Sequence, residues 1–269
     1  MTDGLYRQDP LLPAEREEFE EDLVSFCDRE LDLLCELHGL DVLYAGGSSL
    51  LWLEGLSQRV GMRGSITALD ADEKRVEATR GNLSNADLPA PVRLVGGDVF
   101  RPPFGPCSFD LVYSAGLFHE LDAREGDAAQ AISALAAVAR PGGRVATGDF
   151  VASVPAAQLE DERLDAELAL VSSGRELFGI GPPQRLAALH KEAVSDVRWR
   201  VLPPFPIRHL GKVVLAQDEP AELLGLPPEA AERWRGRREA LRERIHREGY
   251  TRPATVYVEG VVPGGDRGW

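Results

Sequence analysis

The sequence is poor in the residues that crosslink a chain or anchor it in a bilayer. Only Cys27, Cys35 and Cys107 are cysteines among 269 residues, too few and too unevenly spaced for a disulfide framework or a paired metal-ligand motif. No apolar run approaches the roughly 20 residues needed to cross a bilayer, and the polar, acidic start lacks the features of a signal peptide. We therefore expect a cytoplasmic protein without a metal site and without a membrane partner.

Basic residues are scarce relative to acidic ones. The chain has 30 Lys and Arg against 44 Asp and Glu, a formal net charge of −14. Such a surface repels phosphate backbones, which argues against nucleic acid as a partner. Hydrophobic residues at 43% and charged residues at 28% are typical of a globular protein that can bury its own core.

The N-terminal segment carries most of the acidic excess. Residues 1–40 hold twelve acids and three arginines. Between Glu17 and His38, apolar residues recur at three- and four-residue steps, which predicts an amphipathic helix that Gly39 ends. The predicted buried stripe is Phe19, Leu23, Phe26, Cys27, Leu31, Leu34 and Leu37. We interpret residues 1–40 as an N-terminal helical cap with a solvated acidic face.

From residue 41, short β-rich runs alternate with helical stretches. Strands are expected at residues 41–45, 65–70, 92–98, 109–114 and 143–150, and helices at 49–56, 71–83 and 127–139. Parallel neighbours need a crossover connection, so this alternation predicts an α/β fold with helices on both faces of a parallel sheet. Ligands bind at the carboxyl ends of the strands in such a sheet.

The residues that follow each strand are therefore the candidate site. The first strand leads into a small turn, residues 45–49, whose N–H groups are expected to point outward at a helix N-terminus. Asp70 ends the second strand, where an acid can accept hydrogen bonds from a ribose diol. The third and fourth strands lead to Asp98, Val99, Phe100, Ser114, Ala115, His119 and Glu120.

In this order, the segments resemble the class I S-adenosylmethionine-dependent methyltransferases, particularly the small-molecule branch that includes the ubiquinone and menaquinone biosynthesis type. The resemblance rests on VLYAGGSS, ITALDADEKRVEATRGNL, GGDVFRPPFGPCSFDLVYSAGLFHEL and ARPGGRVATGDF. It implies a Rossmann-like, doubly wound sheet of seven mostly parallel strands, with residues 41–150 as the cofactor-binding core. The implied function is methyl transfer from S-adenosylmethionine to a small organic acceptor.

The resemblance also implies how the cofactor would be held. Asp70, with Ala71 beside it, would hold the ribose hydroxyls, and Asp98 would bind the adenine amino group. The alternative for both acids is a helix N-cap or turn residue. The other implied contacts are Ala45, Gly46, Gly47 and Ser48 at the methionine end, Val99 and Phe100 at the adenine ring, and Ser114 and Ala115 at the sulfonium.

The first glycine motif departs from the family pattern. Tyr44 stands where the family has an acid that anchors the cofactor's ammonium group, and Ser48 and Leu50 replace glycines. A Cβ on the turn narrows the space where backbone meets ligand. One alternative is therefore a catalytically silent member of the fold that acts as a binding or scaffold protein. Another, a nicotinamide-dependent oxidoreductase, is disfavoured because GGSSLL lacks the GxGxxG turn.

His119 is the candidate general base. It lies just beyond the fourth strand, where acceptors dock in the family it resembles, and histidine titrates near neutral pH. Glu120 would orient it or replace it. The alternative is a structural histidine whose hydrogen bonds are satisfied in the core.

Residues 151–269 are expected to form a lid, the last strands and the substrate-recognition part of the same domain. Residues 154–194 are typical of two helices around a break at 179–183, interpreted as a lid over the acceptor. Residues 197–206 begin like a sixth strand. For the last strand we favour residues 255–262 over 212–217, which leaves 207–252 as an insertion.

The insertion contains an arginine-rich helix over residues 227–250. One interpretation is a solvated helix whose Arg233, Arg237, Arg244 and Arg247 pair with nearby glutamates. The other is that some of these arginines, with Arg208, His209 and Tyr250, select an anionic acceptor. A homodimer is left open. The tryptophans expected in core or lid packing are Trp52, Trp199 and Trp234.

Overall fold

A computed structural model describes residues 10–83, 86, 88–121, 128–152 and 156–264. Seven strands form one sheet within these residues, in the order β3-β2-β1-β4-β5-β7-β6. β1 to β5 pair in parallel, and β7 runs antiparallel to both β5 and β6. The strands are β1 (Asp41–Ala45), β2 (Ser65–Asp70), β3 (Val92–Gly96), β4 (Phe109–Ala115), β5 (Ala139–Phe150), β6 (Ser195–Leu202) and β7 (Thr255–Val261).

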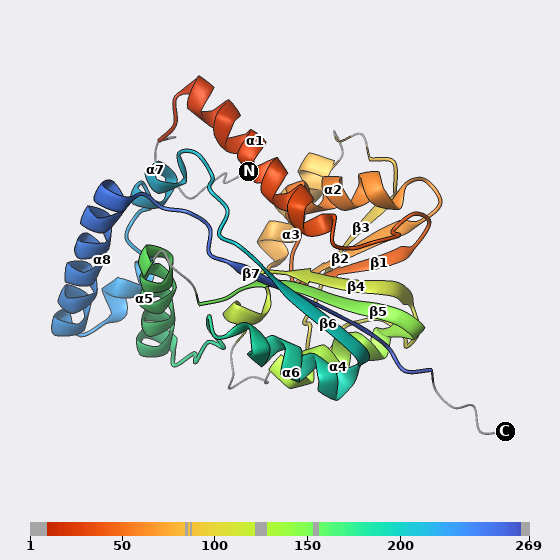
Figure 1. Ribbon diagram of the computed structural model, residues 1–269. Helices are drawn as coiled ribbons and strands as arrows, with labels where there is room; N and C mark the ends of the chain where they lie inside the picture. The colour runs from red at the N-terminus through yellow and green to blue at the C-terminus, as the bar shows by residue number, and fades with distance from the viewer. Residues whose placement is uncertain (1–9, 84–85, 87, 122–127, 153–155, 265–269) are drawn as a thin grey trace.

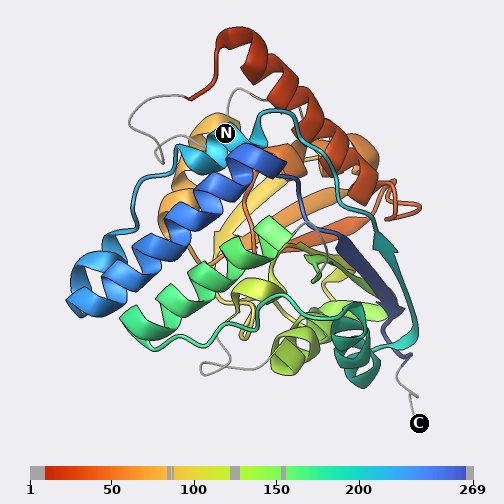
Figure 2. The ribbon, with the colours of Figure 1, turned by 60° about the vertical axis from the view of Figure 1, so that its left-hand side comes forward.

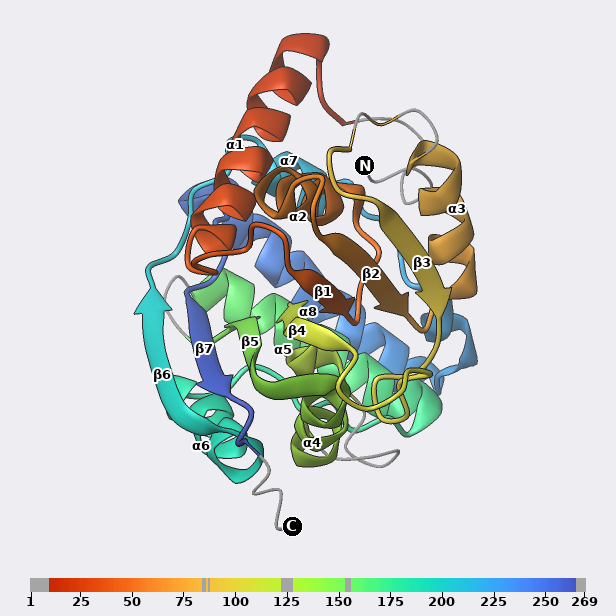
Figure 3. The ribbon, with the colours of Figure 1, turned by 90° about the vertical axis from the view of Figure 1, so that its right-hand side faces the viewer.

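Helices cover both faces of the sheet, as the alternating pattern predicts. Figure 3 shows the strands side by side, with α1, α2 and α3 above them and α4 and α6 below. These helices are α1 (Pro13–Leu31), α2 (Leu50–Val60), α3 (Glu73–Leu83), α4 (Ala128–Val138) and α6 (Pro183–Ala193). The predicted starts of two helices, at residues 127 and 154, lie outside the described residues.

The sheet is buried on both faces, which explains why its strands lack clean alternation of apolar and polar residues. Leu43 of β1 packs with α4 and α6 on one face, while Val42 packs with α1 and α2 on the other. Both side chains are fully buried. Burial of this kind contributes roughly 1.5–3 kcal/mol for each large aliphatic side chain.

The remaining helices stand beyond the carboxyl ends of the strands (Figures 1 and 2). α5 (Ala156–Ser173) lies beside α8 (Pro228–Glu248), and α7 (Leu210–Leu215) joins them to the N-terminal half of α1. Short 3-10 helices span Phe118–Glu120 and Ala221–Gly225. A separate core, which includes Phe19, Leu164 and Trp234, holds this layer together. The insertion between the last two strands therefore caps the edge of the sheet at which ligands bind in this class of fold.

The predicted end of the N-terminal helix is wrong, whereas the favoured choice of last strand is confirmed. α1 ends at Leu31 and not at Gly39, because the chain turns there and the Leu34 amide bonds to the carbonyl of Leu31. Leu34 and Leu37 are nevertheless buried as expected, since the segment after the helix packs onto the same face. The rejected candidate for the last strand, residues 212–217, begins within α7, and the favoured segment forms β7.

Two expectations about the C-terminal part need correction. Of the two helices interpreted as a lid, α5 lies beyond the carboxyl ends, whereas α6 packs beneath the sheet against α4, β6 and β7 with its first turn close to His119 and Asp149. Trp199 is 40% exposed because β6 is the edge strand, whereas Trp234 is buried as expected.

Candidate functional site

A cavity of about 390 Å³ lies at the carboxyl ends of β1, β4 and β5. Its walls come from the turn after β1, the segments after β4 and β5, α1, α5 and the start of β7. This volume falls within the usual range for small-molecule sites, roughly 300–1,000 Å³. A larger hollow of about 600 Å³ opens at the amino ends of β1 and β2, on the opposite edge from the one at which such sheets bind ligands.

The turn after β1 brings backbone against the cavity. Gly46 has a φ of +81°, and a Cβ at this position would collide with the side chain of Leu117, so only glycine fits without strain. The amides of Gly46 and Gly47 both donate to the carbonyl of Leu69, at 2.8 and 3.0 Å. Contrary to expectation, these two N–H groups are used inside the protein and do not point outward.

Asp70 lies at the expected strand end, but its oxygens are already engaged. The Ser48 hydroxyl donates to Oδ2 at 2.8 Å, and the Asp72 amide donates to Oδ1 at 2.9 Å. Asp70 is only 5% exposed. Ser48, which replaces a family glycine, thus binds the Asp70 carboxylate, to which the resemblance assigns the ribose hydroxyls. The hydrogen bond from the Asp72 amide supports the interpretation of Asp70 as a turn residue.

The residues expected around adenine lie at the end of β3, outside the lining of the cavity. Asp98 is exposed and accepts a hydrogen bond from the Phe100 amide at 2.9 Å. Val99 is buried, Phe100 is half-buried and Ala71 is exposed. The positions are therefore close to the end of β2, since Asp70 pairs with Gly96 of β3.

Ser114 and Ala115 are the last two residues of β4, and only Ala115 lines the cavity. The Ser114 hydroxyl lies 3.1 Å from that of Thr147, which in turn lies 3.1 Å from Nε2 of His190. These three side chains are buried on the face of α6, because successive side chains on a strand point to opposite faces. The Ser114 side chain is therefore engaged on this face and does not line the cavity.

His119 faces the cavity and is held by Asp149, the acid that ends β5. Nδ1 lies 2.7 Å from Oδ1 of Asp149, and the amides of Phe118 and His119 donate to Oδ2 at 2.7 and 3.2 Å. Burial lowers the pKa of His119, but the charge of Asp149 and its hydrogen bond outweigh this and raise the pKa to about 9. The exposed Glu120 is a weaker neighbour, with Oε1 3.7 Å from Nε2.

Sequence reasoning missed Asp149, although it occupies a strand end like the acids that it found. The signal was in GRVATGDF, where an acid follows a buried strand. With this partner, His119 carries a proton at neutral pH and becomes a neutral base only as the pH approaches its raised pKa.

Glu30 of α1 was also missed, and it reaches the cavity from the helical cap. It is 3% exposed, and its Oε1 has no hydrogen-bond partner among the described residues. Burial raises its pKa to about 7, against the lowering influence of the Thr255 hydroxyl and of Arg29. The signal was its spacing, since position 30 continues the buried stripe four residues after Phe26 and three residues after Cys27.

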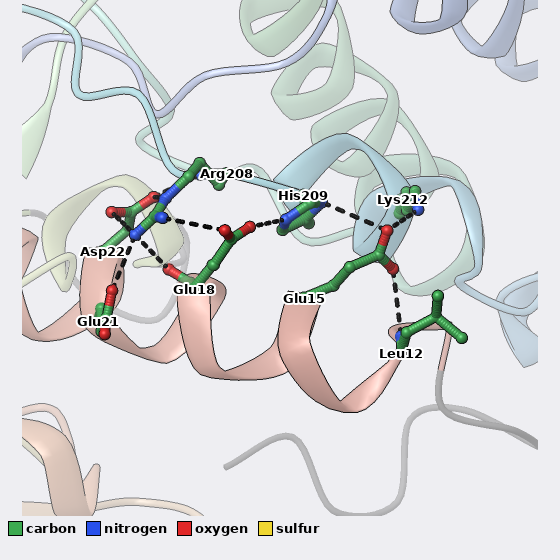
Figure 4. Close-up of polar contacts among 8 residues, drawn as sticks. All are labelled: Leu12, Glu15, Glu18, Glu21, Asp22, Arg208, His209 and Lys212. Atoms are coloured by element: carbon green, nitrogen blue, oxygen red, sulfur yellow. Dashed lines mark hydrogen bonds and ion pairs between the residues drawn. The ribbon is translucent and has the colours of Figure 1, made fainter.

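The arginines and the histidine proposed to select an anionic acceptor are engaged elsewhere. Figure 4 shows Arg208 and His209 lying along the acidic face of α1. The Arg208 guanidinium contacts Asp22 at 2.9 Å, and Nε2 of His209 lies 2.7 Å from Glu18. Arg208 lowers the pKa of Asp22 through these hydrogen bonds. The acidic face of α1 is therefore partly covered and not simply solvated.

The charged helix α8 is likewise paired, mainly with α5. Arg237 contacts Glu160 at 2.7 Å and also pairs with Glu167. Arg238 pairs with Asp161, which accepts a 2.6 Å hydrogen bond from the hydroxyl of Tyr250. Within its own helix, Arg244 approaches Glu248 at 3.9 Å, and Arg247 approaches the same residue at 3.3 Å. The ion-pair interpretation of this helix is the one that the contacts favour.

Within the described ranges, no helix has the length and apolar character of a membrane span. The same residues contain no cluster of three or more His, Cys, Asp or Glu side chains arranged to hold a metal ion.

Residues 42–143 are similar in sequence to known methyltransferases. Residues 42–143 match the model of a family described as "Methyltransferase domain". The 27-O-demethylrifamycin SV methyltransferase of Amycolatopsis mediterranei (strain S699) is 33% identical over 95 residues, which are 35% of this chain and 34% of that protein. The chain thus matches about a third of the length of this curated relative.

Solved structures show the same fold over most of the chain. The cyclopropane-fatty-acyl-phospholipid synthase-like protein of Lactobacillus casei ATCC 334 has a TM-score of 0.68 at 15% identity, covering 90% of this chain and 92% of that one. The YcgJ protein of Bacillus subtilis has a TM-score of 0.56 at 15% identity, covering 91% and 100%. At such identities, the likeness establishes the fold alone.

Proposed function

We propose that the chain is a class I S-adenosylmethionine-dependent methyltransferase that transfers a methyl group to a small organic acceptor; the match of residues 42–143 to a methyltransferase domain and the curated relative support this. The observation that carries the proposal is the cavity of about 390 Å³ at the carboxyl ends of β1, β4 and β5. The glycine turn lies on one side of it and the His119–Asp149 pair on the other. A cofactor and an acceptor can meet between them.

S-adenosylmethionine is the cofactor of this family and supplies an electrophilic methyl group on a positively charged sulfur. The turn residues Gly46 and Gly47 and the strand end at Ala115 fit its amino-acid end, because they expose backbone to the cavity without large side chains. Asp70 and Asp98 would hold the adenosine end. For Asp70, this requires the ribose to share or displace the hydrogen bond from Ser48.

Methyl transfer asks the protein chiefly for positioning, plus removal of a proton when the acceptor is a hydroxyl or thiol. Asp149 fixes the ring of His119 through Nδ1, which leaves Nε2 to accept that proton. With its pKa raised to about 9, neutral His119 is a stronger base than free imidazole, although it is less populated at pH 7. Phe150, whose ring lies 5.1 Å from that of His119, helps to exclude water.

The acceptor is best described as a small organic molecule. Support comes from the cavity's size and from the curated relative, a methyltransferase named for a demethylrifamycin. Four of the arginines that suggest an anionic acceptor are paired with acids of α1, α5 or α8, namely Arg208, Arg237, Arg244 and Arg247. Arg75 and Arg252 are the arginines that line the cavity within the described residues, and an anionic acceptor would depend on them.

A silent binding or scaffold protein is the second candidate, and the Ser48–Asp70 hydrogen bond favours it. Titration calorimetry with S-adenosylmethionine and S-adenosylhomocysteine separates the two. We expect saturable binding of both, followed by methyl transfer in a screen of small hydroxyl, thiol and amine acceptors. If titration to about 1 mM ligand gives no heat of binding, the binding free energy is weaker than about −4 kcal/mol. This result would contradict the enzyme proposal.

A further inference from the structure

A buried polar cluster on the wall of the cavity lacks a partner. Oε1 of Glu30 and the hydroxyl of Tyr113 are inaccessible to solvent and have no hydrogen-bond partner among the described residues. Glu30 and Thr255 line the cavity. A buried polar atom without a partner costs roughly 1–3 kcal/mol, and more when it is charged. Such a cluster therefore indicates a ligand that supplies the missing partners.

These groups gather at the end of β5. A Cβ added to Gly148 would lie 2.8 Å from Oε2 of Glu30 and 3.4 Å from the hydroxyl of Tyr113. Gly148 pairs with Ala115, the residue that ends β4. The glycine thus leaves room for the Glu30 carboxylate directly beside the strand ends that carry the site.

The charged neighbours of Glu30 do not satisfy it. Arg29 donates to the carbonyl of Pro203 at 3.0 Å and lies over the ring of Phe205. Arg252 lies over the rings of Phe26 and Phe150. Neither forms an ion pair with Glu30 within 4.0 Å, although the charges of both arginines lower the pKa of Glu30 and that of Asp149 raises it. Oε1 of Glu30 therefore keeps a free acceptor position for a cationic donor from outside the chain.

The missing cation matches the missing acid of the glycine motif. Tyr44 occupies the acid's position, stacks 6.1 Å from Tyr113 and 6.3 Å from Trp52, and places its hydroxyl under Gly47. No carboxylate reaches the turn from position 44. Glu30, which approaches the same face of the sheet from α1, supplies one.

Building on the proposed function, we propose that Glu30 binds the α-ammonium group of the cofactor and replaces the acid absent at position 44. A primary ammonium has three N–H donors, and the unpartnered Oε1 of Glu30 can accept one of them. The sulfonium has no N–H group and cannot make this hydrogen bond. The helical cap would thereby contribute directly to cofactor recognition.

The test compares two ligands that differ in the amino-acid group. S-adenosylhomocysteine carries the ammonium, whereas 5′-methylthioadenosine keeps the adenosine and the thioether but lacks the amino-acid part. We expect the Glu30→Gln variant to bind S-adenosylhomocysteine about tenfold or more weakly than wild type, because it loses one hydrogen bond to a charged group. The affinity for 5′-methylthioadenosine should stay within about twofold, which also shows that the variant is folded. Glu17→Gln, an exposed position on the same helix, is the matched control and should bind both ligands like wild type.

A second readout follows the proton of Glu30. The wild-type carboxyl group is partly protonated near pH 7, so binding an ammonium should release a fraction of a proton. This release makes the calorimetric heat of S-adenosylhomocysteine binding depend on the ionisation enthalpy of the buffer. We expect Glu30→Gln to lose this dependence.

Equal S-adenosylhomocysteine affinity in wild type and Glu30→Gln would overturn the assignment of Glu30 while leaving the proposed function intact. A parallel loss of affinity for both ligands would also overturn it, because it would show a structural role. If the wild-type protein binds neither ligand, the proposed function fails and this inference fails with it.

Discussion

Replacing Glu30 with glutamine removes a buried ionisable group while keeping the size and shape of the side chain. In the folded protein, burial raises the pKa of this carboxyl group from 4.5 to about 7. Each pH unit between these values corresponds to about 1.4 kcal/mol, so the ionised form is penalised by about 3 kcal/mol.

The sign of the pH dependence follows from which state holds the proton. Below pH 4.5, folded and unfolded chains are both protonated at Glu30. Between pH 4.5 and about 7, only the folded state keeps the proton, so the free energy of unfolding falls as the pH rises. Above about pH 7, the loss is complete. The glutamine variant lacks this loss and should gain about 3 kcal/mol over wild type between pH 4.5 and pH 8.

Urea denaturation of the ligand-free proteins at several pH values measures this difference. With an m-value of about 3 kcal/mol/M, the midpoint of the variant should move by about 1 M relative to wild type. His119 and Glu162 titrate in both proteins and cancel in the comparison, and Glu17→Gln should track wild type. Wild-type and variant curves that run parallel across this pH range would refute the reasoning, because Glu30 would then titrate alike in both states.

Three further predictions concern the strand ends. If His119 is the base, turnover should rise with pH toward an apparent pKa near 9. The Asp149→Asn variant should move both the pH profile of turnover and the NMR titration of His119 to lower pH. A pH profile that does not move in a folded variant would assign the base to another group. The Ser48→Gly variant frees one oxygen of Asp70. Calorimetry should therefore show that this variant binds 5′-methylthioadenosine several-fold more tightly than wild type, in line with about 1 kcal/mol per hydrogen bond. Unchanged or weaker binding would argue against a contact between Asp70 and the ribose. The Gly46→Ala variant places a side chain at a φ of +81° and should lower the free energy of unfolding by about 1–3 kcal/mol. If urea denaturation gives the variant the stability of wild type, the turn relaxes without strain.

Local pattern was enough to predict the sheet and the edge that carries the site. The runs at residues 41–45 and 65–70 form β1 and β2 with the predicted bounds, and residues 255–262 supply the last strand. Hydrophobic clustering, turn residues and the need for crossover connections are all encoded within short stretches of chain. The strand ends that they define include Gly46, Asp70 and His119.

Helix ends and exposure depended on packing that the pattern does not contain. The stripe through Leu34 and Leu37 continues past Leu31, where the helix stops, because burial of these leucines is satisfied by a turn as well as by a helix. Trp199 is apolar and lies on a strand, but only the order of the strands places it at an exposed edge.

The partners of the functional side chains were decided by tertiary structure alone. Asp149 lies 30 residues from His119 in the chain, yet the pairing of β4 with β5 brings them within 2.7 Å. Ser48 reaches Asp70 because β1 and β2 are neighbours, and Glu30 reaches the cavity because α1 packs across the sheet. Sequence by itself determined which strands exist and which residues stand at their ends, since those are local properties. Whether an acid there is paired, shared or left without a partner depends on contacts between distant segments, and those contacts set its charge and its role.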